Sequence, residues 1–183
     1  MEFITDKLNT HILNPIKDIG SSRLIEVFYY DPGGIEFLSD NKAGIQIIGG
    51  QIEFQFEHNR RLFISWANVP GWEQYALSCS GTTFFLETSS KWTMGNSKWW
   101  KPAIGKNLGY AEILGFEDNE GEPNLASLTW GSSYTTAIAN WMFEKDFAPK
   151  YPNGDDIWVL FNESDKIRFS EKMKLIEIGS YKP

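Results

Sequence analysis

The sequence predicts a mainly β fold, an antiparallel β-sandwich or a partly closed barrel with an N-terminal helix; an α+β arrangement is the alternative. Short stretches rich in β-branched and aromatic residues recur along the chain, separated by Gly, Pro, Asn and Asp at turn positions. They do not alternate with helical patterns, as the strands of a parallel sheet would. We expect one domain over residues 1–183, with a helical segment in 1–20 and an antiparallel β core in 23–179.

Residues 5–19 are the helical candidate. Their apolar residues recur at helical spacing: Leu8, Ile12, Ile16 and Ile19. Thr5 is a suitable N-cap. Pro15 lacks a backbone N–H and clashes with the preceding turn, so we expect the helix to kink or end near Asn14.

The strands follow in order. We expect them at residues 24–30, 35–38, 45–48, 52–57, 62–66, 75–78, 82–88, 110–116, 126–130, 134–143, 157–161, 167–169 and 174–178. Residues 137–147 also fit a helix, and 89–106 read as a loop with a single helical turn. The clearest pair is 52–57 with 62–66, because apolar and polar residues alternate on both sides of a short polar link. We expect a hairpin with one wet face that carries Glu53, and with Trp66 turned toward the core.

Composition and charge exclude several classes of protein. Hydrophobic residues make up 42% of the 183 residues and aromatic residues 15%, which excludes wholesale disorder. The formal charge is −7, so the chain is a poor default binder of nucleic acid. Apolar runs stay far below the 18–20 residues of a membrane span, and the start lacks the pattern of a secretory signal. We therefore expect a cytoplasmic protein with neither a nucleic acid nor a membrane as partner.

Motifs for catalysis are missing from the sequence. Phosphate-binding glycine loops and the G-x-S-x-G nucleophile pattern do not occur. Cys79, the single cysteine, lies in an expected strand, which favours a buried structural thiol over a nucleophile. His11 and His58 lack the spacing of metal ligands. We expect no catalytic residues, no cofactor and no metal.

Two weaker patterns leave alternatives. Glu53 and Glu73 lie near aromatic residues, as the carboxylates of a glycosidase do, although the alternation around Glu53 favours a solvated face. Residues 91–106 carry four lysines interleaved with tryptophans, a pattern that can clamp single-stranded nucleic acid. The global charge favours instead a core role for Trp99 and Trp100, with the lysines in water.

Acidic residues concentrate in two segments, 112–122 and 153–165, both without Lys or Arg. Complementary potentials speed association and set specificity, so two such segments indicate a surface that fits a basic partner. The residues expected to face this partner are Glu117, Asp118, Glu120, Glu122, Asp155, Asp156, Glu163 and Asp165.

Three stretches carry a resemblance to a known group of proteins. They are RLFISW at 61–66, WKPAIGK at 100–106, and IWVLF at 157–161 with KIRFS at 166–170. This order is similar to that of small cytosolic bacterial immunity proteins encoded beside polymorphic or contact-dependent growth-inhibition toxins. In those proteins an ISW strand, a W-x-x-x-I-G-K segment and a final strand–turn–strand follow one another.

The resemblance implies a non-enzymatic immunity protein that binds and neutralises a cognate toxin domain one-to-one, either over the toxin's active site or beside it. Many such toxins are basic nucleases, which would suit the acidic segments. The alternative is a carbohydrate- or small-ligand-binding β-domain, with or without enzymatic activity. Its pocket would be lined by aromatic side chains, the candidates being Trp72, Trp92, Trp99 and Trp100.

Overall fold

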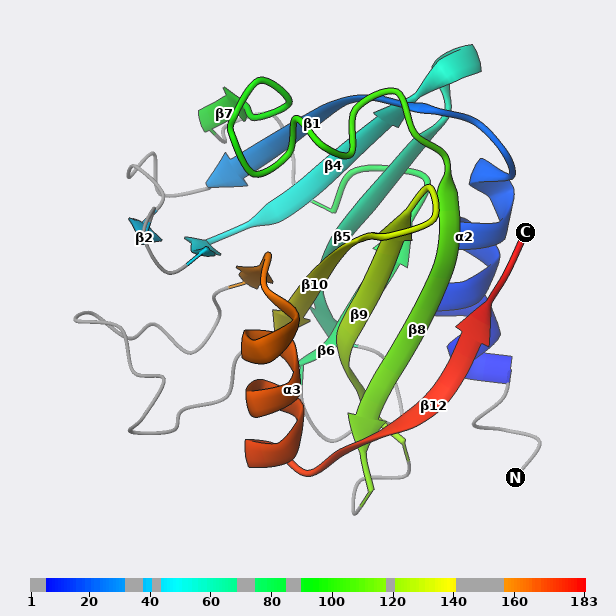
Figure 1. The fold of residues 1–183 in the computed structure, drawn as a ribbon. Coiled ribbons are helices and arrows are strands. Elements are labelled where there is room, and N and C mark those ends of the chain that lie inside the picture. The colour runs from blue at the N-terminus through cyan, green and yellow to red at the C-terminus, as the bar shows by residue number, and fades with distance from the viewer. Residues whose placement is uncertain are drawn as a thin grey trace.

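Two antiparallel sheets face one another in the computed structural model, which describes residues 6–31, 38–40, 44–68, 75–84, 90–117, 121–140 and 157–183 (Figure 1). The five-stranded sheet has the order β6 (Tyr75–Ser80), β5 (Arg61–Asn68), β4 (Gln51–Phe56), β1 (Leu24–Asp31) and β7 (Ser90–Thr93). The seven-stranded sheet has the order β12 (Leu175–Tyr181), β8 (Leu108–Phe116), β9 (Pro123–Trp130), β10 (Tyr134–Asn140), β11 (Ile157–Leu160), β3 (Ile45–Ile48) and β2 (Leu38–Asp40). The expected mainly β class is confirmed, and the sheets form a sandwich that does not close into a barrel.

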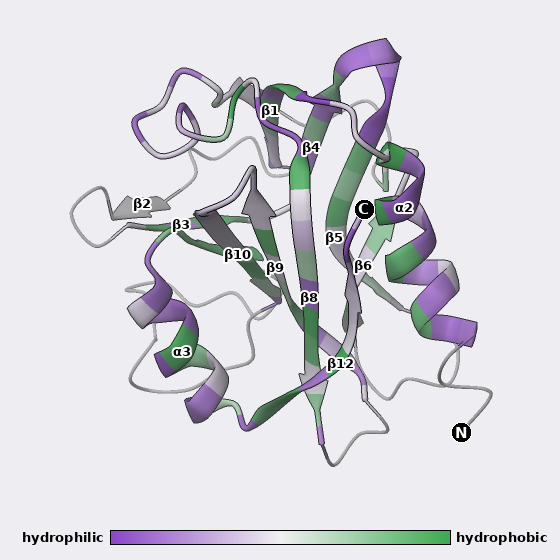
Figure 2. Ribbon diagram, turned by 45° about the vertical axis from the view of Figure 1, so that its right-hand side comes forward, coloured by the Kyte–Doolittle hydropathy of each residue, from purple (hydrophilic) through white to green (hydrophobic). Residues whose placement is uncertain are grey.

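The core lies between the two sheets. Period-two alternation sends Ile52 and Phe54 of β4 to the same side, where both are fully buried. The rings of Phe54 and Trp130 meet there at 5.4 Å across the two sheets. Figure 2 shows hydrophobic residues along the strands and at intervals along the helices, where they alternate with hydrophilic ones. Cys79 belongs to this core, as expected.

The expected hairpin is confirmed. β4 pairs with β5 in register Ile52↔Ile64, and η2 (Glu57–Asn59) forms the turn. His58 adopts a left-handed backbone (φ 59°), a conformation common in tight turns. Trp66 at the end of β5 packs against the core but stays partly exposed.

The expected wet face of this hairpin is wrong. Gln51 and Glu53 are each only 1% exposed. The amide of Gln51 donates to Thr83 Oγ1 (2.7 Å) and its oxygen accepts from the backbone N–H of Phe84 (2.9 Å), so the chain after β6 crosses the outer face of the sheet. Thr82, Thr83 and Phe84 lie outside any strand, so the strand expected at 82–88 is absent from its described part. Residues 85–89 lie outside the described residues.

The N-terminal helix is confirmed from Asp6, with a change in its hydrogen bonding where Pro15 was expected to disturb it. A π-helical stretch, η1 (Asn9–Leu13), passes directly into α2 (Asn14–Ile19). Pro15 has no N–H for the carbonyl of His11, and the hydroxyl of Ser78 donates to that carbonyl instead (3.4 Å). The helix therefore continues past Asn14 and packs beside β6 and β12, at the edges of the two sheets (Figure 1).

The strand expected at 167–169 is a helix, α3 (Glu163–Lys172). Phe169 is fully buried and Met173, four residues later, packs against the same cluster on the outer face of the seven-stranded sheet. Ile167, only two residues from Phe169, is 49% exposed. An alternating stretch of three residues is too short to distinguish the two-residue period of a strand from the 3.6-residue period of a helix, and packing on the sheet selects the helix.

Among the described residues, no helix is long and apolar enough to cross a membrane.

The segment expected to be a loop at 89–106 begins with β7 and continues through a series of turns. Strand 134–143 is confirmed as far as Asn140, and the residues from 141 to 156 lie outside the described part. Strand 35–38 also lies outside it except for Leu38, where β2 begins.

Candidate functional site

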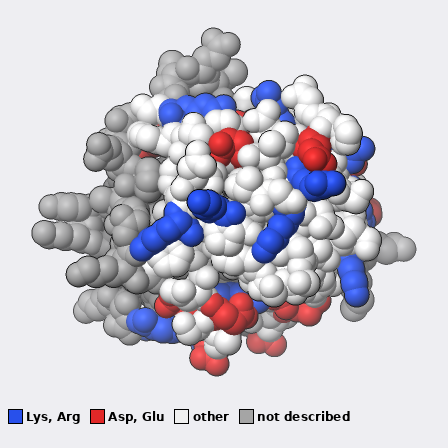
Figure 3. All heavy atoms as spheres, turned by 45° about the horizontal axis from the view of Figure 1, so that its top comes forward, with Lys and Arg blue, Asp and Glu red and all other residues white. Residues whose placement is uncertain are grey.

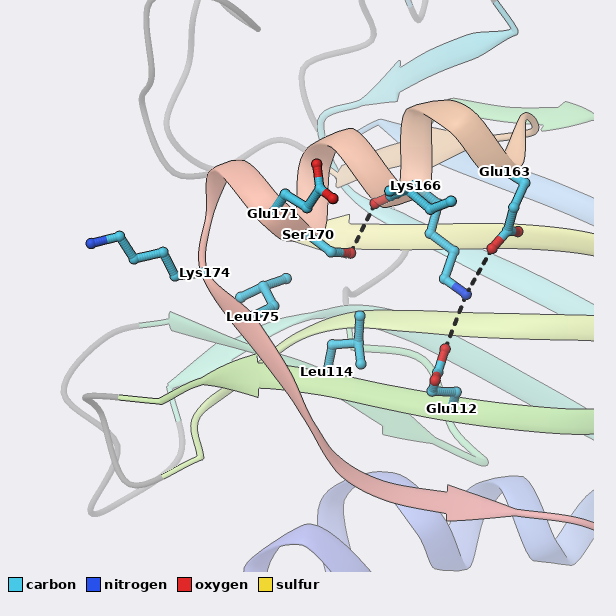
Figure 4. A pocket seen from close by; sticks show the side chains of 9 residues that line it. Glu112, Leu114, Glu163, Lys166, Ser170, Glu171, Lys174 and Leu175 are labelled. Carbon is cyan, nitrogen blue, oxygen red and sulfur yellow. Dashed lines mark hydrogen bonds and ion pairs between the residues drawn. The ribbon is translucent and has the colours of Figure 1, made fainter.

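A pocket lies between α3 and strands β8 and β12 (Figure 4). Its apolar lining comes from Leu114, Ile167 and Leu175. Carboxylates and ammonium groups surround this lining: Glu112, Glu163, Lys166, Glu171 and Lys174. We call these eight residues the α3 surface. It combines an apolar centre with charged margins, which is the general composition of protein–protein interfaces.

Lys166 is the junction of this surface. Its Nζ lies 3.0 Å from Glu112 Oε2 and 3.3 Å from Glu163 Oε1 (Figure 4). Burial opposes the charge on Lys166, but the hydrogen bonds and charges of the two glutamates outweigh it and raise its pKa. Glu112 comes from the first acidic segment and Glu163 from the second, so one lysine joins the two segments through carboxylates that lie 51 positions apart in the sequence.

The start of α3 orients the second acidic segment. Glu163 and Asp165 occupy the first turn, where carboxylates interact favourably with the helix dipole. Asn162 Nδ2 donates to Asp165 Oδ2 (3.0 Å), and the backbone N–H of Asp165 donates to the carbonyl of Asn162 (3.1 Å). Glu163 remains exposed beside the pocket, while Asp165 is half-buried.

The eight residues expected to face a partner differ in exposure, and some lie outside the described residues. Glu117 is exposed at the end of β8, and Glu163 and Asp165 begin α3. Glu122 is 1% exposed, so the expectation that it lies on an open surface is corrected: it precedes β9, and its carbonyl accepts from the N–H of Phe116. The remaining four lie outside the described residues: Asp118, Glu120, Asp155 and Asp156.

A second cluster of charged groups surrounds Glu53 on the outer face of the five-stranded sheet. Lys91 Nζ lies 3.2 Å from Glu53 Oε2, and Arg61 Nε lies 3.5 Å from Oε1. Tyr30 donates its hydroxyl to Oε2. The side chains of Arg61 and Lys91 are 46% and 43% exposed, whereas that of Glu53 is 1% exposed.

Pairing across the strands explains this cluster. Tyr30 lies opposite Lys91 in the β1–β7 register, and Phe28 lies opposite Glu53 in the β1–β4 register. Lys91 Nζ sits 3.7 Å from the centre of the Phe28 ring, a cation–π contact. Burial and the hydrogen bond to Glu53 raise the pKa of Tyr30, which keeps its proton on the phenol. Since the carboxylate is held on both oxygens, this cluster balances charge rather than presenting a free catalytic acid.

Sequence reasoning missed the Glu53 cluster. The alternation of β4 placed Glu53 on the face away from the core, which is correct, but burial was decided by Lys91 and Tyr30 from other strands. The signal in the sequence was weak: a lone carboxylate on a strand followed by two arginines. Glu73, the second carboxylate of the glycosidase alternative, lies outside the described residues.

The third charged feature is the basic loop, which we define as residues 94–106. It carries Lys98, Lys101 and Lys106, and residues 90–111 contain no acidic residue. Trp100 is fully buried and its indole N–H donates to Tyr29 Oη (2.5 Å), so this side chain anchors the loop in the core. Figure 3 shows Lys and Arg side chains spread over one face of the molecule, with Asp and Glu side chains both among them and along the lower edge of the view.

The remaining sequence candidates were a nucleophilic thiol, pocket-lining tryptophans and metal ligands. The thiol of Cys79 is buried, and desolvation raises its pKa, which disfavours the nucleophilic thiolate. Trp100 belongs to the core and cannot line an open pocket, and Trp72 lies outside the described residues. Within the described ranges, His, Cys, Asp and Glu do not gather in a group of three that could hold a metal ion.

The comparisons with known proteins add no relative to this geometry. No family model matches the chain, and neither a curated protein nor a solved structure matches it.

Proposed function

We propose that the protein is a non-enzymatic immunity protein that binds and neutralises a cognate toxin domain, and that the α3 surface contacts the toxin. The observation that carries this proposal is the junction at Lys166, which unites carboxylates of both acidic segments beside an exposed apolar side chain. An interface of this kind needs an apolar centre that loses water and charged margins that select the partner.

Ile167 supplies the apolar centre. It is 49% exposed on a helix whose other exposed residues are polar or charged, so its burial by a partner would be favourable. At about 25 cal/mol per Å² of apolar area, covering one such side chain contributes on the order of 1–2 kcal/mol.

The carboxylates supply the selection. Lys166 compensates part of the charge of Glu112 and Glu163, and Glu171 has no ion pair within the described ranges. A basic toxin surface would find Glu171 and the Glu163 side chain, which is 56% exposed, in position to pair with it. Such margin charges act mainly on the association rate. The toxin would be neutralised by covering its active site or by binding beside it.

Binding to the toxin domain encoded by the neighbouring reading frame tests the proposal. Ile167→Asp should weaken the complex about tenfold or more, because it places a charge in the apolar centre. Ile25→Asp is the matched control, since Ile25 is also 49% exposed but lies on β1 of the other sheet. Biolayer interferometry gives both affinities, and growth of cells expressing the toxin gives protection. Equal affinities for the two variants, or no binding of that toxin by the wild type, would refute the proposal.

A further inference from the structure

We propose that the pocket of the α3 surface binds one arginine side chain of the partner, with the alkyl stem on the apolar lining and the guanidinium on Glu171. The inference rests on the proposed function for the identity of the partner, and it names the chemical group that the partner inserts. Three features of the pocket support it: its size, the positions of the glutamates along α3, and the unequal use of their oxygens.

The pocket is small, and its centre is apolar. It has a volume of about 290 Å³. Pockets that hold whole small-molecule ligands measure about 300–1,000 Å³, so this one lies at the lower limit and suits a single side chain. Leu114, Ile167 and Leu175 form its apolar lining. Methylene groups laid on this lining leave water, which favours a cation with a long aliphatic stem over a bare metal ion.

The glutamates of α3 stand at both ends of this lining. Glu163, Ile167 and Glu171 follow one another at intervals of four residues, so they share one side of the helix. Each interval corresponds to a rise of about 6 Å along the helix axis. A carboxylate therefore lies about one helical turn from Ile167 in either direction, within reach of a long side chain whose stem covers that isoleucine.

The two ends differ in what their carboxylates already hold. At the start of the helix, Lys166 Nζ lies 3.3 Å from Glu163 Oε1 and 3.0 Å from Glu112 Oε2 (Figure 4). At the other end Glu171 is exposed, and its carboxylate has neither an ion pair nor a hydrogen bond within the described part of the chain. Both oxygens of Glu171 are thus available to an incoming cation.

Lys174 is the remaining cation of the lining, and it does not occupy the pocket. It follows α3 with a left-handed backbone (φ 52°), and Figure 4 shows its side chain directed away from the other labelled residues. The lining therefore carries three carboxylates against two ammonium groups, one of which is shared by two of the carboxylates. This balance favours a cation over an anion, and the formal charge of −7 acts in the same direction.

The two available oxygens of Glu171 favour a guanidinium over an ammonium group. A guanidinium presents parallel N–H groups that match both oxygens of a carboxylate, whereas an ammonium is a compact and strongly hydrated point charge. The guanidinium is also more weakly hydrated, so it loses less on approaching the apolar side chain of Ile167. Arginine is accordingly enriched among the residues that dominate the energy of protein–protein binding.

Methyl NMR of the full chain, labelled at its Ile and Leu methyl groups, tests the inference with N-acetyl-arginine methylamide as the probe. The comparison probes are the same derivatives of citrulline, which has the shape of arginine without its charge, and of lysine. The test variant is Glu171→Gln. Its matched control is Asp18→Asn, which removes one negative charge from an exposed residue of α2 that does not line the pocket.

The arginine derivative should shift the methyl signals of Leu114, Ile167 and Leu175 in a saturable manner. The citrulline and lysine derivatives should bind more weakly. Glu171→Gln should weaken binding of the arginine derivative about fivefold, and Asp18→Asn should bind it as the wild type does. Absence of these shifts, or an equal loss in both variants, would overturn the inference. Equal affinity for the citrulline derivative would assign the pocket to a neutral side chain, and tighter binding of the lysine derivative would assign it to lysine.

This experiment needs no toxin, so the two proposals fail separately. If the toxin binds the wild type more tightly than Ile167→Asp but the arginine derivative does not bind, the present inference is refuted and the proposed function stands. If the arginine derivative binds as expected and the toxin does not bind, the proposed function is refuted and the arginine site stands.

Discussion

Replacing both cations that hold Glu53 should destabilise the protein more than replacing Glu53 itself. The first perturbation is Arg61→Met with Lys91→Met, and the second is Glu53→Gln. The structure sets this asymmetry, because the Glu53 side chain is 1% exposed while those of Arg61 and Lys91 are 46% and 43% exposed. Loss of the cations leaves a buried charge, whereas loss of the carboxylate leaves cations that water already solvates.

The magnitudes follow from the burial of each group. Removing the partners of a buried charge costs about 3–5 kcal/mol of unfolding free energy. In Glu53→Gln the half-exposed ion pairs contribute about 0–1 kcal/mol, and the bond from Tyr30 changes from charge-assisted to neutral at a cost of about 1 kcal/mol. We therefore expect roughly 1–2 kcal/mol for Glu53→Gln, clearly below the double variant.

Urea unfolding at neutral pH, followed by tryptophan fluorescence, measures these differences. The triple variant E53Q/R61M/K91M is the internal control, because it removes the buried charge together with its partners. It should be more stable than R61M/K91M. Equal losses for Glu53→Gln and the double variant, or a triple variant less stable than the double, would refute the assignment of Glu53 as a buried charge that depends on its two cations.

Three further predictions concern the core and its margins. Cys79 should resist a thiol reagent under native conditions and react only on unfolding, because it is buried and its pKa is raised; rapid native labelling would contradict this. Trp100→Ala should cost about 3–5 kcal/mol in chemical unfolding, and Trp66→Ala less, since Trp100 is fully buried and Trp66 is partly exposed; the reverse order would contradict it. Burial raises the pKa of Tyr134 to about 12, and its hydroxyl donates to the Trp99 carbonyl. The protonated phenol should therefore contribute stability that is complete below its ordinary pKa of about 10 and is lost as pH rises through about 12. The stability difference between wild type and Tyr134→Phe, measured by unfolding across this range, should disappear at the alkaline end; a difference that persists there would contradict it.

Local sequence patterns predict the positions of most strands without any tertiary contact. The hairpin of β4 and β5 follows from two alternating stretches around a polar link, and its register pairs the predicted apolar residues Ile52 and Ile64. The sequence also favoured a buried Trp100 with exposed lysines on either side, because the negative charge of the chain opposes the alternative of a nucleic-acid clamp, and the structure buries Trp100. These features depend on neighbours within a few residues.

Other local patterns were ambiguous because the deciding contact lies elsewhere in the chain. Residues 167–169 alternate like a strand, but Phe169 and Met173 find their partners on the outer face of the seven-stranded sheet only as a helix. The acidic segments that supply Glu112 and Glu163 to the candidate site could be recognised in the sequence. That they meet at Lys166 could not be predicted, because the ion pair joins Glu112 to a lysine 54 positions along the chain.

The sequence by itself determined the class of the fold, the positions of most strands along the chain and the inward side of the β4–β5 hairpin, because period-two alternation is a property of neighbouring residues. Only the tertiary structure decided what covers the outward side. Glu53 points away from the core, as its pattern requires, yet it is buried because β7 brings Lys91 over it from 38 positions along the chain. Alternation specifies the direction of a side chain, and solvent exposure depends on whichever distant segment the fold lays across it.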